Sequence, residues 1–169
     1  MNDPIVNRVA QNTSLINLEL KDFGSDKKRV EIDIKKWLYK GLVLKEKPFR
    51  TSLKNHDWSS YKDMLVCINC SSDVIIPTWA YMLVTVYLEE YAEFVCVGSL
   101  NQLEINLFNH NIFQLDSSIY KDKRILIKGC SETYIPDSAY VSILKQLMPV
   151  AKSVMFGEAC SNVPVFKKR

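Results

Sequence analysis

Three Cys-Ser dipeptides are the feature of this 169-residue sequence with the clearest chemical potential. They begin at Cys70, Cys130 and Cys160, and each lies at or just beyond the end of a short apolar run typical of a buried strand. Ligands bind beyond the carboxyl ends of the strands in an open parallel sheet, so neighbouring strands would bring these thiols to one rim. Thiolates are preferred ligands of zinc and of iron–sulfur clusters. The sequence therefore predicts a metal site with zinc or an iron–sulfur cluster as its cofactor.

A tetrahedral site needs a fourth ligand besides the three thiolates. His56 is the candidate, because it stands just before the first clear strand, and Asp73, Glu158 or a bound water could replace it. The other two cysteines, Cys67 and Cys96, are expected in the core, since buried and unreactive is the commonest state of the residue. Cys67 also belongs to a C-x-x-C pattern, but strand residues three apart point to opposite faces, which argues against a redox motif.

A second interpretation makes the protein a thiol enzyme. Cys130 would be the nucleophile or sulfur acceptor and His56 its base, since Gly129 and the helix expected after Cys130 favour an exposed thiolate. No orienting acid at a recognisable spacing and no second glycine forming an oxyanion loop accompany them. Whether the protein is an enzyme stays open at this point.

The elements that must position these residues alternate between strand and helix. Strands are expected at 64–69, 93–98, 124–128 and 152–156, and helices at 77–91, 99–113 and 136–148. Strands that are apolar on both faces predict an α/β fold with a mostly parallel sheet and helices on both faces. We expect one domain over 1–169, with repeated strand–helix units over 64–157 and a less regular flank over 1–60.

An internal echo supports the repeated units. In both copies a strand is followed by Cys-Ser, a short loop, Ile-Pro and a helix, and the prolines are Pro77 and Pro136. The distance from cysteine to proline is seven residues in one copy and six in the other. The pattern of the flank over 1–60 is less regular. An edge strand is expected there at 15–20 and short helices at 33–40 and 48–53.

The net charge of +3 is too small to indicate a nucleic acid or an acidic membrane as the partner. Positive charge is nevertheless concentrated, because residues 21–54 hold eleven Lys and Arg against five Asp and Glu. A third interpretation is therefore an interaction module with structural cysteines, whose basic flank and frayed tail at 166–169 dock an acidic partner. An N-terminus without an apolar segment and an odd number of cysteines favour the cytoplasm.

Four motifs carry a resemblance to a known family: His56-Asp57-Trp58, Pro77-Thr78-Trp79-Ala80-Tyr81-Met82, Lys128-Gly129-Cys130-Ser131 and Gly157-Glu158-Ala159-Cys160-Ser161. On these motifs the chain resembles an uncharacterised bacterial family, domain of unknown function twenty-four-eighty, found chiefly in the Bacteroidetes. The resemblance extends from Ile5 to Pro164. It implies no established activity, but members are often encoded near the machinery that assembles iron–sulfur clusters. The resemblance thus implies an accessory role in cluster assembly, with the assembly proteins as partners.

Overall fold

A computed structural model of the chain describes residues 15–129, 133–158 and 160–169. The strands in these ranges are β1 (Leu15–Leu18), β2 (Arg29–Asp33), β3 (Leu65–Asn69), β4 (Phe94–Val97), β5 (Arg124–Ile127), β6 (Ser153–Glu158) and β7 (Ser161–Lys167). The α-helices are α1 (Glu46–Lys54), α2 (Thr78–Leu88), α3 (Leu100–Phe113) and α4 (Asp137–Leu147). Single 3₁₀ turns are η1 (Leu20–Phe23), η2 (Ile34–Trp37), η3 (Trp58–Tyr61) and η4 (Ser117–Tyr120).

The α/β class with mostly parallel strands is confirmed, and the strands are divided between two sheets. One sheet has the order β2-β3-β4 and the other β1-β5-β6-β7. Every pairing in them is parallel except that of β6 with β7. Periodicity shows where strands lie but not which of them pair, so the division could not be deduced from the sequence pattern.

The chain forms two compact units that follow the two sheets. Unit 2 is residues 25–107, and unit 1 joins residues 1–24 to residues 108–169. Helix α3 begins in unit 2 and ends in unit 1, since the boundary falls after Leu107. Unit 2 is therefore inserted in the chain of unit 1.

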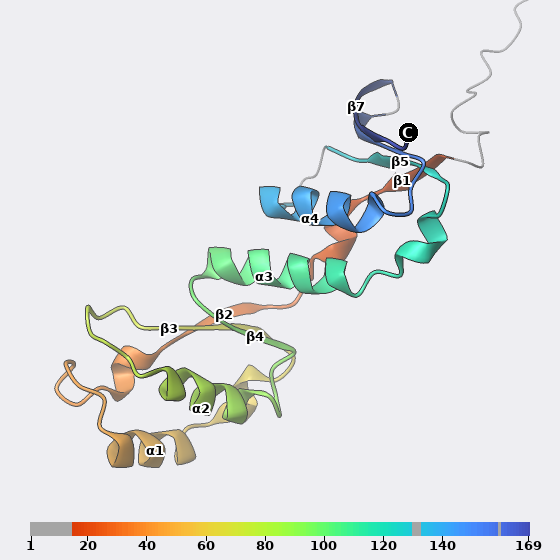
Figure 1. The fold of residues 1–169 in the computed structure, drawn as a ribbon. Coiled ribbons are helices and arrows are strands. Elements are labelled where there is room, and N and C mark those ends of the chain that lie inside the picture. The colour runs from red at the N-terminus through yellow and green to blue at the C-terminus, as the bar shows by residue number, and fades with distance from the viewer. Residues whose placement is uncertain (1–14, 130–132, 159) are drawn as a thin grey trace, which may run out of the picture. The chain divides into compact units, whose positions relative to one another are not determined.

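In unit 2, helices cover both faces of the sheet. Figure 1 shows α1 and α2 on one side of β2-β3-β4 and α3 on the other. The alternation of β3 explains this, because Val66 and Ile68 pack in one buried cluster with α1 and α2, whereas Leu65 and Cys67 pack in another with Leu103. The strand is apolar on both faces because both are covered.

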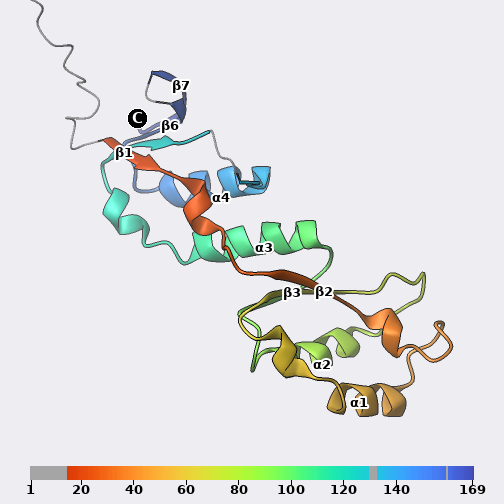
Figure 2. The same cartoon turned by 180° about the vertical axis from the view of Figure 1, so that it is seen from behind.

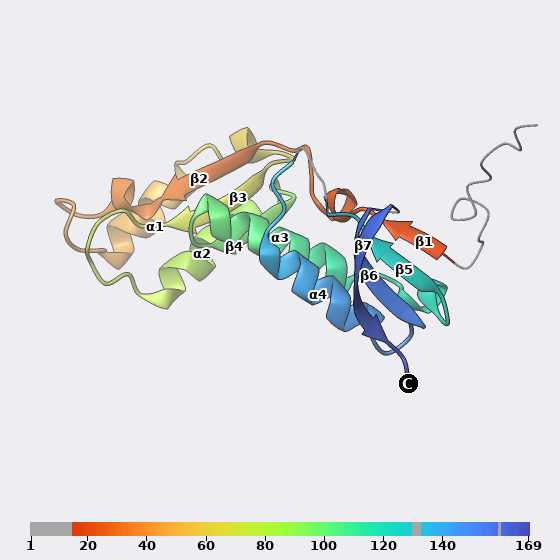
Figure 3. The same ribbon diagram turned by 90° about the horizontal axis from the view of Figure 1, so that it is seen from above.

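In unit 1, α4 and the end of α3 pack against the same face of the sheet. Ile125 and Val154 on the strands share one buried cluster with Ile112 of α3 and Ile143 of α4. Figures 2 and 3 show α4 beside β5 and β6. The tail expected at 166–169 begins within a strand, because Phe166 and Lys167 belong to β7 and Phe166 packs against this cluster.

The two units repeat one layout. The elements η3, β3, α2 and β4 of unit 2 correspond to η4, β5, α4 and β6 of unit 1, each beginning 59 residues further on, as Leu65 does before Arg124. Buried positions repeat too, with Ala80 and Ala139 as one pair. The elements β1 and η1 likewise precede β2 and η2 by 14 residues, as Leu20 precedes Ile34.

The repeat extends to backbone conformations. Gly98 and Gly157, 59 residues apart, have φ of +133° and +126°, a region that disfavours any residue with a Cβ. Asp63 and Asp122 correspond in the same way, with φ of 59° and 57°. The echo in the sequence is thus a structural repeat, but its register places Gly129 and not Cys130 at the position of Cys70.

The N-terminal flank is more regular than the sequence indicated. The edge strand expected at 15–20 and the helix expected at 48–53 are present as β1 and α1. The helix expected at 33–40 is present only as the 3₁₀ turn η2. The prediction is wrong beyond it, because the chain turns back on itself after Leu38. Strand β2 was missed, since its alternating charged residues resemble a solvated segment.

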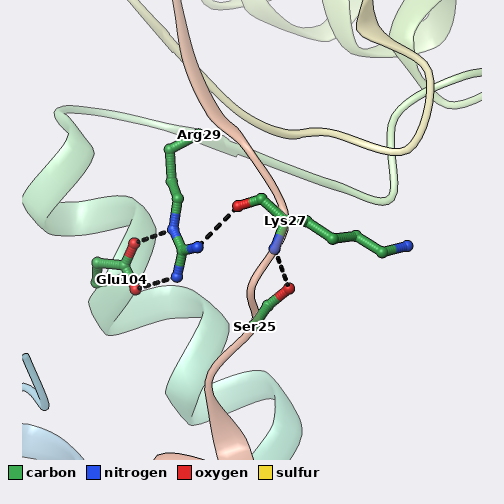
Figure 4. Close-up of polar contacts among 4 residues, drawn as sticks. All are labelled: Ser25, Lys27, Arg29 and Glu104. Atoms are coloured by element: carbon green, nitrogen blue, oxygen red, sulfur yellow. Dashed lines mark hydrogen bonds and ion pairs between the residues drawn. The ribbon is translucent and has the colours of Figure 1, made fainter. Parts of the chain in front are cut away.

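An ion pair joins the start of β2 to α3 within unit 2 (Figure 4). The guanidinium of Arg29 binds both carboxylate oxygens of Glu104, with Nε to Oε1 at 2.7 Å and Nη2 to Oε2 at 3.2 Å. Nη1 of Arg29 donates to the carbonyl of Lys27 at 2.7 Å. The planar guanidinium thus fixes the strand and the helix at once.

Candidate functional site

The cysteines of unit 2 lie on two faces of its sheet. Cys67 is buried and Cys96 half-buried in the cluster under α3, whereas Cys70 packs with the cluster under α1 and α2. Burial raises the pKa of the Cys67 thiol to about 11, and burial also raises the pKa of Cys96. The expectation of two core cysteines is confirmed, and so is the opposed direction of the C-x-x-C pair.

The other two predicted thiols lie in the chain of unit 1. Cys160 is exposed at the turn between β6 and β7. Cys130 lies outside the described residues. Strands β5 and β6 are neighbours, but β3, which Cys70 follows, belongs to the other sheet. The argument from neighbouring strand ends therefore does not apply to Cys70.

His56 lies in an aromatic cluster. Its Nε2 is hydrogen-bonded to the Tyr61 hydroxyl at 3.0 Å, and its ring meets the rings of Trp37 and Trp58 edge-on at 5.4 and 4.6 Å. Burial and the neighbouring Lys36 ammonium lower the pKa of the imidazole. The neutral ring is therefore favoured, which suits packing, base chemistry and metal ligation equally.

A metal centre is not assembled by the residues that the structure describes. Within residues 15–129, 133–158 and 160–169, no three His, Cys, Asp or Glu side chains gather in a group able to hold a metal ion. Because Cys130 is outside these ranges, the site of Cys70, Cys130, Cys160 and His56 stays a prediction. In the same ranges, no helix is long and apolar enough to span a membrane.

A different surface stands out on unit 2, at the turn that follows η2. The backbones of Tyr39 and Val43 pair in both directions, at 2.7 and 3.3 Å. Lys40 and Gly41 at its tip have φ of 51° and 70°, the left-handed region that a tight hairpin turn requires. The turn holds apolar side chains in water, since Leu42 is 68% and Val43 54% exposed.

Lysines and aromatic rings are interleaved around this hairpin. The Nζ of Lys36 lies 4.3 Å from the ring centroid of Trp37, and the Nζ atoms of Lys45 and Lys40 lie 3.6 and 5.6 Å from that of Tyr39. We call these five residues the basic–aromatic surface. They line a cavity of about 270 Å³ together with Leu38, Pro48 and Ser52. Cation–π contacts of this kind hold ammonium groups in place without neutralising them.

Among the described residues, the lysines of this surface form no close ion pair, although the Asp33 carboxylate attracts the Lys36 ammonium from further away. In the described part of the chain, Lys36, Lys40 and Lys45 form no ion pair within 4.0 Å, although Arg29 and Arg50 of the same unit do. Partial burial lowers the pKa of Lys36, and the attraction of Asp33 opposes this only in part. Such charges would gain from an anion placed among them.

The sequence reasoning identified the positive flank but missed this surface. It assigned the docking of an acidic partner to the whole flank over residues 21–54 and singled out no aromatic residue within it. The available signal was the segment from Lys36 to Lys40, in which lysines flank Trp37 and Tyr39, followed by Gly41. Lysines next to aromatics at a glycine turn indicate a binding loop more strongly than charge alone.

Comparison with known proteins gives a family and no activity. Searches among curated proteins and among solved structures found no significant match. The model of the family described as "Protein of unknown function (DUF2480)" matches residues 3–168, nearly the whole chain. The resemblance stated from the sequence motifs is thereby confirmed, and the chain belongs to the DUF2480 family.

Proposed function

We propose that this protein is a binding module that recognises an acidic partner protein through the basic–aromatic surface of unit 2. One observation carries the proposal: three lysine ammonium groups are held over two aromatic rings around one cavity, with no carboxylate of the described chain paired to them. Charge of one sign around a concave surface attracts and orients a partner of opposite charge.

Exposed apolar side chains beside these lysines add contact area to the charge. Leu42 and Val43 stand out from the hairpin next to Lys40, so a partner would cover both kinds of group together. Most interfaces combine an apolar centre with a polar rim, and this surface offers both.

Binding of a fluorescent Glu-rich peptide, measured by anisotropy at several salt concentrations, tests the proposal. The triple variant K36Q/K40Q/K45Q is compared with K28Q/K54Q/K62Q, which removes equal charge from exposed lysines of the same unit. At about 0.5 to 1 kcal/mol per pair, the first variant should weaken binding roughly tenfold to a hundredfold and flatten its salt dependence. Equal weakening by the control triple, or binding indifferent to salt, would refute the proposal.

Metal or cluster binding is the second candidate. The thiols of Cys70 and Cys160 are half-buried and exposed at the ends of β3 and β6, and Cys130 follows the last residue of β5 by three positions in the sequence. With His56 they would bind zinc or an iron–sulfur cluster in the cytoplasm and assist cluster assembly. Metal analysis of protein purified without oxygen tests this candidate. Absence of stoichiometric metal, together with a fold and colour that Cys130→Ser leaves unchanged, would eliminate it.

A further inference from the structure

We infer that the cavity of the basic–aromatic surface is a subsite for a phosphate monoester on the partner, such as a phosphorylated serine. The inference rests on the proposed function and names the group that anchors the partner. Three lysines gather around one open depression of about 270 Å³, which suits one compact group of high charge better than a surface of many weak charges, such as a membrane.

The donors reach the cavity from three elements. Lys36 comes from η2, Lys40 from the hairpin tip, and Lys45 precedes the first turn of α1. Ser52, one further turn along α1, adds a hydroxyl for which the described residues provide no hydrogen-bond partner. Donors from several directions match a tetrahedral group with three terminal oxygens better than a planar carboxylate with two.

The beginning of α1 adds a favourable field. Lys45 occupies the N-cap position and no side chain caps the helix, so its first N–H groups are left without a side-chain acceptor. Glu46, the acid in the first turn of α1, accepts a hydrogen bond from Arg50 at 2.9 Å and is partly neutralised by it. The helix dipole at this end and the three ammonium groups favour an anion with two charges.

The internal repeat shows that this hairpin is present in one of the two copies. In unit 1, η1 ends at Phe23, the residue that corresponds to Trp37, and Gly24 follows it. No counterpart of the Leu38–Lys45 segment follows there, because unit 2 is inserted at that point. Tyr39, Lys40 and Lys45 therefore have no counterparts in unit 1, and the repeated layout does not account for them.

The test uses the full chain and a pair of Glu-rich peptides that differ only in phosphorylation of one central serine. The unphosphorylated peptide reports the proposed function, and the ratio of the two affinities reports the phosphate subsite. We expect phosphorylation to raise the affinity about tenfold, as one or two charge-assisted hydrogen bonds would. Lys45→Gln should abolish this gain, and Lys54→Gln should preserve it.

Two further arms separate the subsite from general charge. Ser52→Ala leaves the charge unchanged and should reduce the gain about threefold through loss of one hydrogen bond. Phenyl phosphate at constant ionic strength should shift the amide resonances of the hairpin, and benzoate should shift them clearly less. An equal response to benzoate, a gain that survives Lys45→Gln, or binding to phosphatidate vesicles without a response to phenyl phosphate would overturn the inference. If the unphosphorylated peptide still binds in that case, the proposed function stands without the phosphate subsite.

Discussion

Arg29 and Glu104 should be a strong stabilising pair of unit 2, and a double-mutant cycle measures their coupling. Both side chains are largely withdrawn from water, at 29% and 16% exposed, and two hydrogen bonds of 2.7 and 3.2 Å join them. Hydrogen bonds between charged groups contribute about 1.5 to 3 kcal/mol, and we expect a coupling near the lower figure because the pair retains some solvent. The hydrogen bond to Glu104 raises the pKa of Arg29, so the pair keeps its charge on the arginine side at every pH of interest.

The cycle consists of Arg29→Met, Glu104→Gln and the double variant, with hydrogen exchange of the β3 amides as the report on unit 2. Each single variant leaves its former partner partly buried and should lose more stability than the coupling alone. Arg50 and Glu46 provide the matched control, since they form a solvent-exposed pair on α1 with side chains 51% and 61% exposed. That pair should couple by only about 0.3 to 0.5 kcal/mol. A coupling of Arg29 with Glu104 no larger than the control would refute this reasoning.

Three further predictions follow from the turns and the titratable groups. Gly98→Ala and Gly157→Ala should each lower the melting temperature through roughly 1 to 3 kcal/mol of backbone strain, and an unchanged melting temperature would contradict the positive φ at these sites. Alkylation followed by mass spectrometry should label Cys160 at neutral pH and spare Cys67, whose thiol has a pKa of about 11; similar rates would contradict its burial. Because the pKa of His56 is lowered in the fold, its contribution to stability is complete above the unfolded value of about 6.5 and falls with pH below it. The free energy of unfolding, measured by urea titration from pH 7.5 to 5, should fall in the wild type and fall less in His56→Gln. The same pH dependence in both proteins would contradict the prediction.

Local patterns in the sequence located most elements of the repeated region, because each helix and strand there is buried on a face with a regular period. The run from Leu65 to Asn69 is apolar on both faces, and both faces are covered. Cys67 and Cys70 were correctly assigned to opposite faces by alternation alone. These features depend on neighbours in the sequence, which is why periodicity captures them.

Pairing between strands was beyond such patterns. Strand β1 pairs with β5, more than a hundred residues away, while β2 pairs with β3 across the intervening turn and helix. An uninterrupted order of strand and helix is compatible with one sheet or with two, so the expected meeting of three strand ends had no support in sequence spacing. Strand β2 was likewise not predicted, because the charges at Arg29 and Glu31 are typical of an exposed segment although Ile32, between them and Asp33, is buried.

The repeat separates what the fold needs from what one copy has added. Positions shared by the two units are mainly buried apolar ones, such as Val84 with Ile143 and Leu88 with Leu147, and these account for the common layout. The lysines over aromatic rings lie in unit 2, on a hairpin whose place in unit 1 is taken by the inserted unit 2. The cation–π contacts hold three like charges together with no carboxylate of the described chain within 4.0 Å of them, so an anion bound among the lysines would be attracted by all three.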